Sequence, residues 1–163
     1  TLDTAVIAHA LGLLRNRRFG GQCDVDQLVL LAIYHDCSEI LTGDMPTPIK
    51  YYNPEIKNAY KQVEAAAQDK LLSQLPEALR PAYREMLEAP KDPERYALVK
   101  AADKLSAYIK CIEERKAGNN EFLSAEAQSL EALKKMELPE ADYFIEHFIP
   151  AFEKTLDELG TIE

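Results

Sequence analysis

Residues 24–41 of the chain read DVDQLVLLAIYHDCSEIL. The apolar run from Leu28 to Ile33 predicts a helix at the centre of the core, and Asp24 can cap its first turn by accepting from exposed backbone N–H groups. We expect this helix to continue to Leu41. Its end then carries the polar stretch 34–39, where an unpaired charge beside such an apolar segment would be costly.

Helical signals flank this segment on both sides. Apolar residues recur with helical spacing between Leu2 and Leu13. Asn53-Pro54 and Asp92-Pro93 each place a capping side chain before a first-turn proline, and the second pair opens a long helix that ends near Gly118. Further helices are expected at 77–87, 121–136 and 141–159. With no alternating strand pattern in competition, the sequence predicts an all-α fold of about seven helices.

Bulk properties narrow the class of protein. A chain of 163 residues with 47% hydrophobic composition fits one domain. No apolar run approaches the roughly 20 residues that a membrane-spanning helix requires, so no membrane partner is expected. A net charge of -9 argues against binding to nucleic-acid polymers. Three widely spaced cysteines form neither a disulfide framework nor a metal motif, which fits a reducing cytoplasm.

Two adjacent residues, His35 and Asp36, are both of metal-ligand type, and a metal ion would offset the cost of their charge. On a continuous helix Glu39 would lie one turn further along the same flank, which suits a carboxylate that transfers protons or orients a ligand. The alternative is a hydrogen-bonded histidine–aspartate pair in the core with no metal.

A third candidate ligand, Asp103, lies on the long helix between small residues in the stretch KAADKL at 100–105. Together with His35 and Asp36 it would offer one nitrogen and two carboxylates, which suits Mn²⁺, Co²⁺, Fe²⁺ or Mg²⁺. The alternative is an exposed Asp103 that pairs with Lys100 or Lys104.

Two motifs, YHDCSEILTGDMPTP at 34–48 and KAADKL at 100–105, resemble the HD-domain superfamily. Within it, the chain is most similar to the bacterial 5'-deoxynucleotidases, which remove phosphate from deoxyribonucleoside 5'-monophosphates. The resemblance covers nearly the whole chain. It implies a single compact HD-domain helical bundle over residues 1–163 and a homodimer.

The resemblance also implies roles for individual residues. His35, Asp36 and Asp103 would hold the divalent ion, and Asp36 and Asp103 would also contact the substrate. Glu39 would be the acid/base carboxylate. Asp44 is implied to act in catalysis by meeting the attacking water or the sugar. The loop that contacts the nucleotide would comprise Asp44, Met45, Pro46 and Thr47. A rigid connector, in which Asp44 only caps, is the alternative for this loop.

One ligand of the implied set falls outside the sequence. The resemblance places a further metal-binding His one position before Thr1, so a missing N-terminal segment is expected. His9 is a rival for that role, but it lies about 13 Å along the helix axis from the expected position, which favours a core or hydrogen-bonded histidine.

Two other functions stay open. The chain could be a different HD-domain hydrolase that acts on another nucleotide or a phosphodiester. It could also be a non-catalytic helical interaction module whose metal site has degenerated.

Overall fold

The computed structural model describes residues 1–46, 49, 52–88 and 92–160, and every regular element within these ranges is helical. The all-α prediction is therefore confirmed. No helix in the described part of the chain is both long enough and apolar enough to cross a bilayer. The elements are α1 (Leu2–Arg17), α2 (Val25–Tyr34), α3 (Glu39–Thr42), α5 (Pro54–Ser73), η1 (Glu77–Leu79), α6 (Arg80–Leu87), α7 (Pro93–Lys116), η2 (Asn120–Phe122), α8 (Leu123–Lys134), α9 (Pro139–His147), α10 (Ile149–Glu153) and α11 (Leu156–Leu159).

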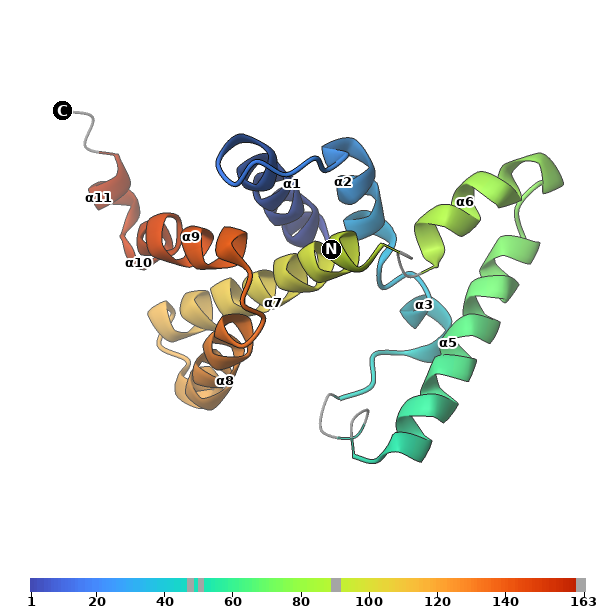
Figure 1. Cartoon of the computed structure of the whole chain (residues 1–163). Helices are drawn as coiled ribbons and strands as arrows, with labels where there is room; N and C mark the ends of the chain where they lie inside the picture. Colours follow the sequence, from blue (N-terminus) through green and yellow to red (C-terminus); the bar gives the residue numbers. More distant parts are fainter. Residues whose placement is uncertain (47–48, 50–51, 89–91, 161–163) are drawn as a thin grey trace.

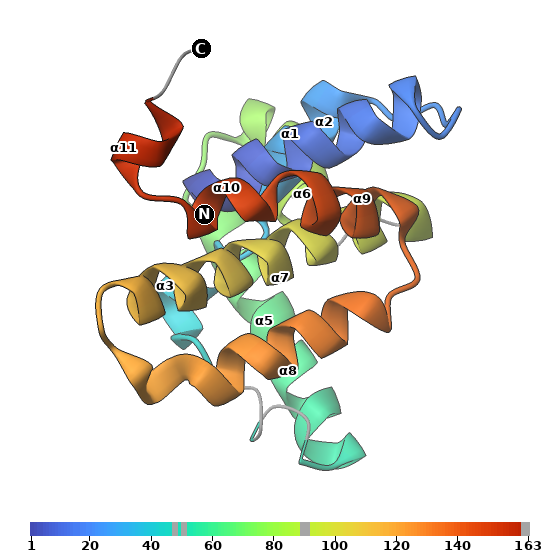
Figure 2. The ribbon, with the colours of Figure 1, turned by 90° about the vertical axis from the view of Figure 1, so that its left-hand side faces the viewer.

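The long helix α7 forms the centre of the molecule, with α1 and α2 packed against it and α8 returning beside it (Figures 1 and 2). Its side chains Leu98, Leu105 and Ile112 are fully buried, as are Leu11 on α1 and Leu28 on α2. Each such side chain contributes about 1.5–3 kcal/mol through burial. The pair formed by α5 and α6 extends to one side and contacts the rest through α2 and α3 (Figure 1).

Polar caps start three of the helices where the sequence placed them. The Asp24 carboxylate accepts from the N–H of Gln27 at 3.0 Å, and Asn53 Oδ1 accepts from the N–H of Ile56 at 2.7 Å. Asp92 accepts from the N–H of Glu94 at 3.0 Å. These bonds satisfy backbone donors that the first turn leaves open.

The prediction that the second helix runs to Leu41 is wrong. The helix ends at Tyr34, residues 35–38 form a turn, and the separate helix α3 follows. In the last turn of α2 the Ala32 carbonyl accepts a bond of 2.7 Å from the ring of His35, which satisfies one of the carbonyl groups that a helix end leaves open. His35 is thus the C-cap residue of α2 and not an interior residue of a longer helix.

The single helix predicted at 141–159 is also wrong, because the structure divides this segment into α9, α10 and α11. Pro150 lies in the first turn of α10, where its missing N–H cannot continue the ladder of α9. Likewise, 77–87 and 121–136 each begin with a short 3₁₀ turn before the α-helix. The end of α7 near Gly118 is confirmed, with a φ of 88° at that glycine.

Candidate metal centre

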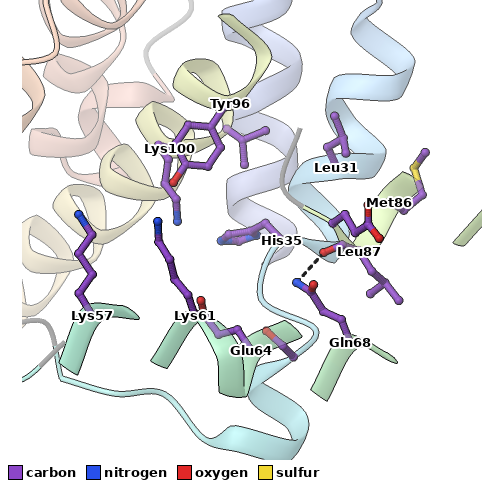
Figure 3. A pocket seen from close by; sticks show the side chains of 13 residues that line it. Leu31, His35, Lys57, Lys61, Glu64, Gln68, Met86, Leu87, Tyr96 and Lys100 are labelled. Carbon is purple, nitrogen blue, oxygen red and sulfur yellow. Dashed lines mark hydrogen bonds between the residues drawn. The ribbon is translucent and has the colours of Figure 1, made fainter. Parts of the chain in front are cut away.

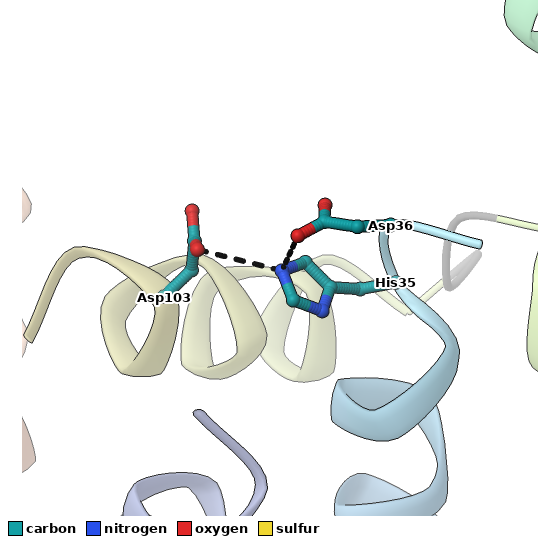
Figure 4. Close-up of side chains that lie close together, drawn as sticks. All are labelled: His35, Asp36 and Asp103. Carbon is teal, nitrogen blue, oxygen red and sulfur yellow. Dashed lines mark hydrogen bonds and ion pairs between the residues drawn. The ribbon is translucent and has the colours of Figure 1, made fainter. Parts of the chain in front are cut away.

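Three side chains converge where the end of α2 meets the middle of α7. His35 and Asp36 come from the turn after α2, and Asp103 comes from α7 (Figure 4). One ligand atom from each lies within 4.8 Å of the others. The structure therefore brings together the three residues that the sequence proposed as ligands, although 67 positions separate Asp36 from Asp103 along the chain.

The orientation of the His35 ring follows from its hydrogen bonds. Its Nδ1–H donates to the Ala32 carbonyl at 2.7 Å, because a carbonyl oxygen can only accept. The other nitrogen, Nε2, faces Asp36 Oδ2 at 2.8 Å and Asp103 Oδ1 at 3.4 Å (Figure 4). A backbone carbonyl that fixes the far ring nitrogen is the usual support of a metal-binding histidine. Nε2 is the nitrogen that can serve as the ligand.

Electrostatics at the cluster show a surplus of negative charge. Burial disfavours the charged form of His35, but hydrogen bonds to Asp103 and Asp36 outweigh it and raise the pKa to about 9. Burial raises the pKa of Asp103 and His35 lowers it, and the net shift is downward. Each partner is thus stabilised by the opposite charge of the other. The two carboxylates therefore favour positive charge at Nε2 of His35.

The donor set fits a divalent metal ion. Two carboxylate oxygens and one imidazole nitrogen match the ligands that Mn²⁺, Co²⁺ or Fe²⁺ accept, and Mg²⁺ also favours the oxygens. The side chain of Asp103 is 42% exposed, so the cluster is open to solvent on that side. The alternative of Asp103 as a surface residue paired only with a lysine does not describe this geometry, since it faces His35.

Two hollows adjoin the cluster. One, of about 520 Å³, is lined by Asp36, Asp103 and Thr1 among others, so the beginning of α1 lies beside the candidate ligands. The other, of about 150 Å³, is lined by His35 and Ser38 together with residues of α5, α6 and α7 (Figure 3). The three side chains of the cluster thus border two accessible spaces.

Glu39 occupies a different position from the one expected. Since α2 ends at Tyr34, Glu39 does not share a helical flank with His35; it is the first residue of α3. Its N–H donates to the Asp36 carbonyl at 2.9 Å, which fixes its backbone against the candidate ligand. Its side chain is half-buried.

The loop after α3 begins at Gly43, whose φ of 71° allows a sharp change in chain direction. The hydroxyl of Tyr60 on α5 donates to the Gly43 carbonyl at 3.2 Å and fastens the loop to that helix. Asp44 and Pro46 are exposed and Met45 is half-buried. Thr47, the last residue proposed for substrate contact, lies outside the described residues.

Residues beyond the proposed set also line the smaller hollow. Lys57, Lys61 and Tyr96 were not singled out from the sequence, and Lys100 appeared only as a partner for Asp103. Two lysines at i and i+4 on a helix are an ordinary surface pattern, so no local signal marked them. His9, the rival ligand, is exposed on α1, so the core role expected for it is wrong, and the hydrogen-bonded role stays a prediction.

Comparison with known proteins agrees with this geometry. A sequence model of the family described as 5'-deoxynucleotidase YfbR-like matches residues 1–152. The chain belongs to this family. The 5'-deoxynucleotidase of Erwinia tasmaniensis is 49% identical, over 98% of this chain and 81% of its own length. The 5'-deoxynucleotidase of Vibrio vulnificus is 48% identical, over 98% of this chain and 83% of its own length.

A solved structure supports the fold of this family member. An HD-domain phosphohydrolase from Listeria innocua superposes with a TM-score of 0.77, covering 92% of this chain and 73% of its own, at 24% sequence identity. The prediction of an HD-domain helical fold is confirmed.

Proposed function

We propose that this chain is a metal-dependent 5'-deoxynucleotidase, which hydrolyses deoxyribonucleoside 5'-monophosphates to deoxyribonucleosides and phosphate. The observation that carries the proposal is the convergence of three ligand atoms within 4.8 Å in a member of the 5'-deoxynucleotidase YfbR-like family. Two relatives, which are 49% and 48% identical to this chain, are named 5'-deoxynucleotidase, and these names support the same substrate class.

In this proposal His35, Asp36 and Asp103 hold the divalent ion, and both aspartates also face the substrate from the larger hollow. When bound, the ion supplies Lewis acidity and the positive charge that a phosphate needs in a chain of net charge -9. His35 contributes Nε2 because its Nδ1–H is engaged by Ala32. The metal is of the Co, Mn, Fe or Mg class.

Glu39 is proposed to transfer the proton during hydrolysis, and Asp44 to orient the attacking water or the sugar. One observation supports a place for Glu39 near the reaction: its N–H donates to the Asp36 carbonyl at 2.9 Å, which fixes the start of α3 beside this candidate ligand. The loop that begins with Asp44 is proposed to contact the nucleotide through Met45, Pro46 and Thr47. The anchoring of Gly43 by Tyr60 supports a fixed loop path.

Substrate comparison tests the activity directly. Phosphate release is measured from dAMP, AMP and a cyclic dinucleotide with Mn²⁺ or Co²⁺ present. We expect fastest release from dAMP. Preferred cleavage of the cyclic dinucleotide would indicate a different HD-domain hydrolase. Absence of both bound metal and phosphate release would favour the non-catalytic module.

The role of Glu39 has its own test. Glu39→Gln removes the proton-transferring group and keeps the size of the side chain. We expect kcat for dAMP to fall by about 10²- to 10⁴-fold while the metal content, measured by elemental analysis, is unchanged. Unchanged turnover would remove Glu39 from the mechanism.

We further propose that the chain forms one HD domain and works as a homodimer in the cytoplasm. Large exposed side chains, such as Ile40 on α3 and Val63 on α5, support a subunit contact. Three free cysteines support a reducing compartment. Light scattering on the purified protein tests the dimer, which a monomer mass at micromolar concentration would contradict.

A further inference from the structure

Three lysines gather on one side of the smaller hollow, next to His35. Lys57 and Lys61 extend from α5 toward α7, where Lys100 and Tyr96 face them (Figure 3). The lysines come from α5 and α7, which are separate in sequence, so only the tertiary arrangement of these helices brings them to one space. Their convergence is therefore a property of the fold.

The lysines give this side of the hollow a positive charge, whereas the chain as a whole is negative. Bringing three ammonium groups together costs free energy, because like charges repel. The net charge of the chain is -9. The hollow also contains two acids, Glu64 and Glu88. Glu88 accepts from Arg84 at 2.9 Å, so that acid is engaged by a guanidinium from its own helix region. The lining thus carries three lysines against these two acids, and the three ammonium groups on one side form a local concentration of positive charge that an anion would stabilise.

The size of the hollow limits what it can accept. Its volume of about 150 Å³ is below the roughly 300–1,000 Å³ of sites that enclose a whole small-molecule ligand. One anionic group fits this space better than an entire nucleotide. Because His35 lines the same wall, an anion held there would lie beside the metal centre.

We propose that Lys57, Lys61 and Lys100 form a phosphate subsite, which binds the 5'-phosphate of the substrate beside the metal centre. The proposal rests on the function proposed above. Each lysine ammonium offers three donors and one compact charge, and phosphate oxygens accept such charge-assisted bonds. Lys100 lies one turn before Asp103 on α7, so the same helix presents a metal ligand and a phosphate donor.

This subsite has a consequence for specificity. Recognition of the phosphate by lysines takes no information from the base, and the small hollow leaves sugar and base outside it. The three lysines would then bind the phosphate of every deoxyribonucleoside monophosphate alike. Discrimination of the sugar falls to other parts of the site.

The test uses the metal-loaded protein and two readouts: the Kd of inorganic phosphate by calorimetry, and KM and kcat for dAMP. The variants are Lys61→Gln, Lys100→Gln and their combination. Loss of one charge-assisted bond should raise the phosphate Kd and the KM for dAMP about tenfold. Lys61→Arg keeps the charge and should stay within about threefold of wild type. Metal content and thermal stability are measured on every variant.

A matched control is available on the same helix. Lys70 is an exposed lysine of α5 that does not line the hollow, so Lys70→Gln removes the same charge from the chain without touching the cluster. We expect the phosphate Kd of this control to match wild type. Equal losses in Lys70→Gln and Lys61→Gln would show a general charge effect and overturn the subsite.

Failure of the subsite and failure of the proposed function give different results. If wild type hydrolyses dAMP and the double variant keeps its KM and phosphate Kd, the subsite is wrong and the function stands. If phosphate binding depends on the lysines but no dAMP is hydrolysed, the anion site stands and the function is wrong. Undetectable phosphate binding by wild type would overturn the subsite.

Discussion

Two charged clusters of this protein have nearly the same plan. At the metal centre, His35 lies between the carboxylates of Asp36 and Asp103. Where α1, α7 and α9 meet, Arg15 lies between two glutamates: its Nε donates to Glu140 at 2.9 Å and its Nη1 to Glu94 at 2.5 Å. Each cluster places one cationic side chain between two acids, one of which comes from α7.

The difference between the clusters is in the central residue. A guanidinium carries only donors and keeps its proton, so Arg15 can join helices but cannot bind a metal ion. An imidazole can give up its proton and expose a nitrogen lone pair toward the same two carboxylates. The arrangement of acids is thus shared, and the chemistry of the central side chain separates a structural cluster from a candidate active site.

The first prediction concerns metal affinity, and with it activity, at the metal centre. Asp103→Asn keeps the shape of the side chain but removes a charged ligand, so we expect Mn²⁺ or Co²⁺ affinity to fall about 100-fold or more, with dAMP hydrolysis falling alongside. Competition with a metal-binding dye measures it. The fold should persist, because the side chain is partly exposed. Wild-type affinity would place the metal elsewhere.

The second prediction concerns stability at the Arg15 cluster. Arg15→Met removes the cation and leaves Glu140, whose side chain is 2% exposed, buried without its partner. We expect the free energy of unfolding to fall by about 3–5 kcal/mol. Urea denaturation measures the loss. Metal affinity per folded molecule should match wild type, and a fall of the size expected for Asp103→Asn would show that the clusters are not separate.

A smaller effect is expected from Glu140→Gln. The amide oxygen can still accept from Arg15, while Oε2, which is buried and lacks a hydrogen-bond partner among the described residues, is replaced by an amide nitrogen. Loss of the charge should cost about 1–3 kcal/mol in denaturant unfolding. A cost as large as that of Arg15→Met would mean that the charge of Glu140 carries the whole interaction.

The smallest effect is expected at the outer acid of the same cluster. Glu94 is 75% exposed, so solvent screens its pairing with Arg15. Glu94→Gln should lower the unfolding free energy by less than about 1 kcal/mol. Thermal melts of Glu94→Gln and Glu140→Gln provide the comparison. A larger loss of stability for Glu94→Gln would contradict the prediction that the more buried acid contributes more.

Local signals predicted most helix starts, because a capping side chain and a first-turn proline act within a few residues, as at Asn53-Pro54 and Asp92-Pro93. The helix ends were harder. The end of α2 at Tyr34, where the ring of His35 turns back to bond the Ala32 carbonyl, was not predicted, and neither was the division near Pro150. The candidate ligands His35, Asp36 and Asp103 were predicted from the sequence, because residue types and motifs can be read from it directly.

The sequence by itself determined the helical class, the starts of α2, α5 and α7, and the identity of three candidate ligands. Those features depend on periodicity, capping and residue chemistry, which act over short distances along the chain. Only the tertiary structure decided that Asp103 faces His35 and that Lys57 and Lys61 meet Lys100. Such meetings depend on how buried faces pack, and packing joins residues whose separation along the chain carries no local signal.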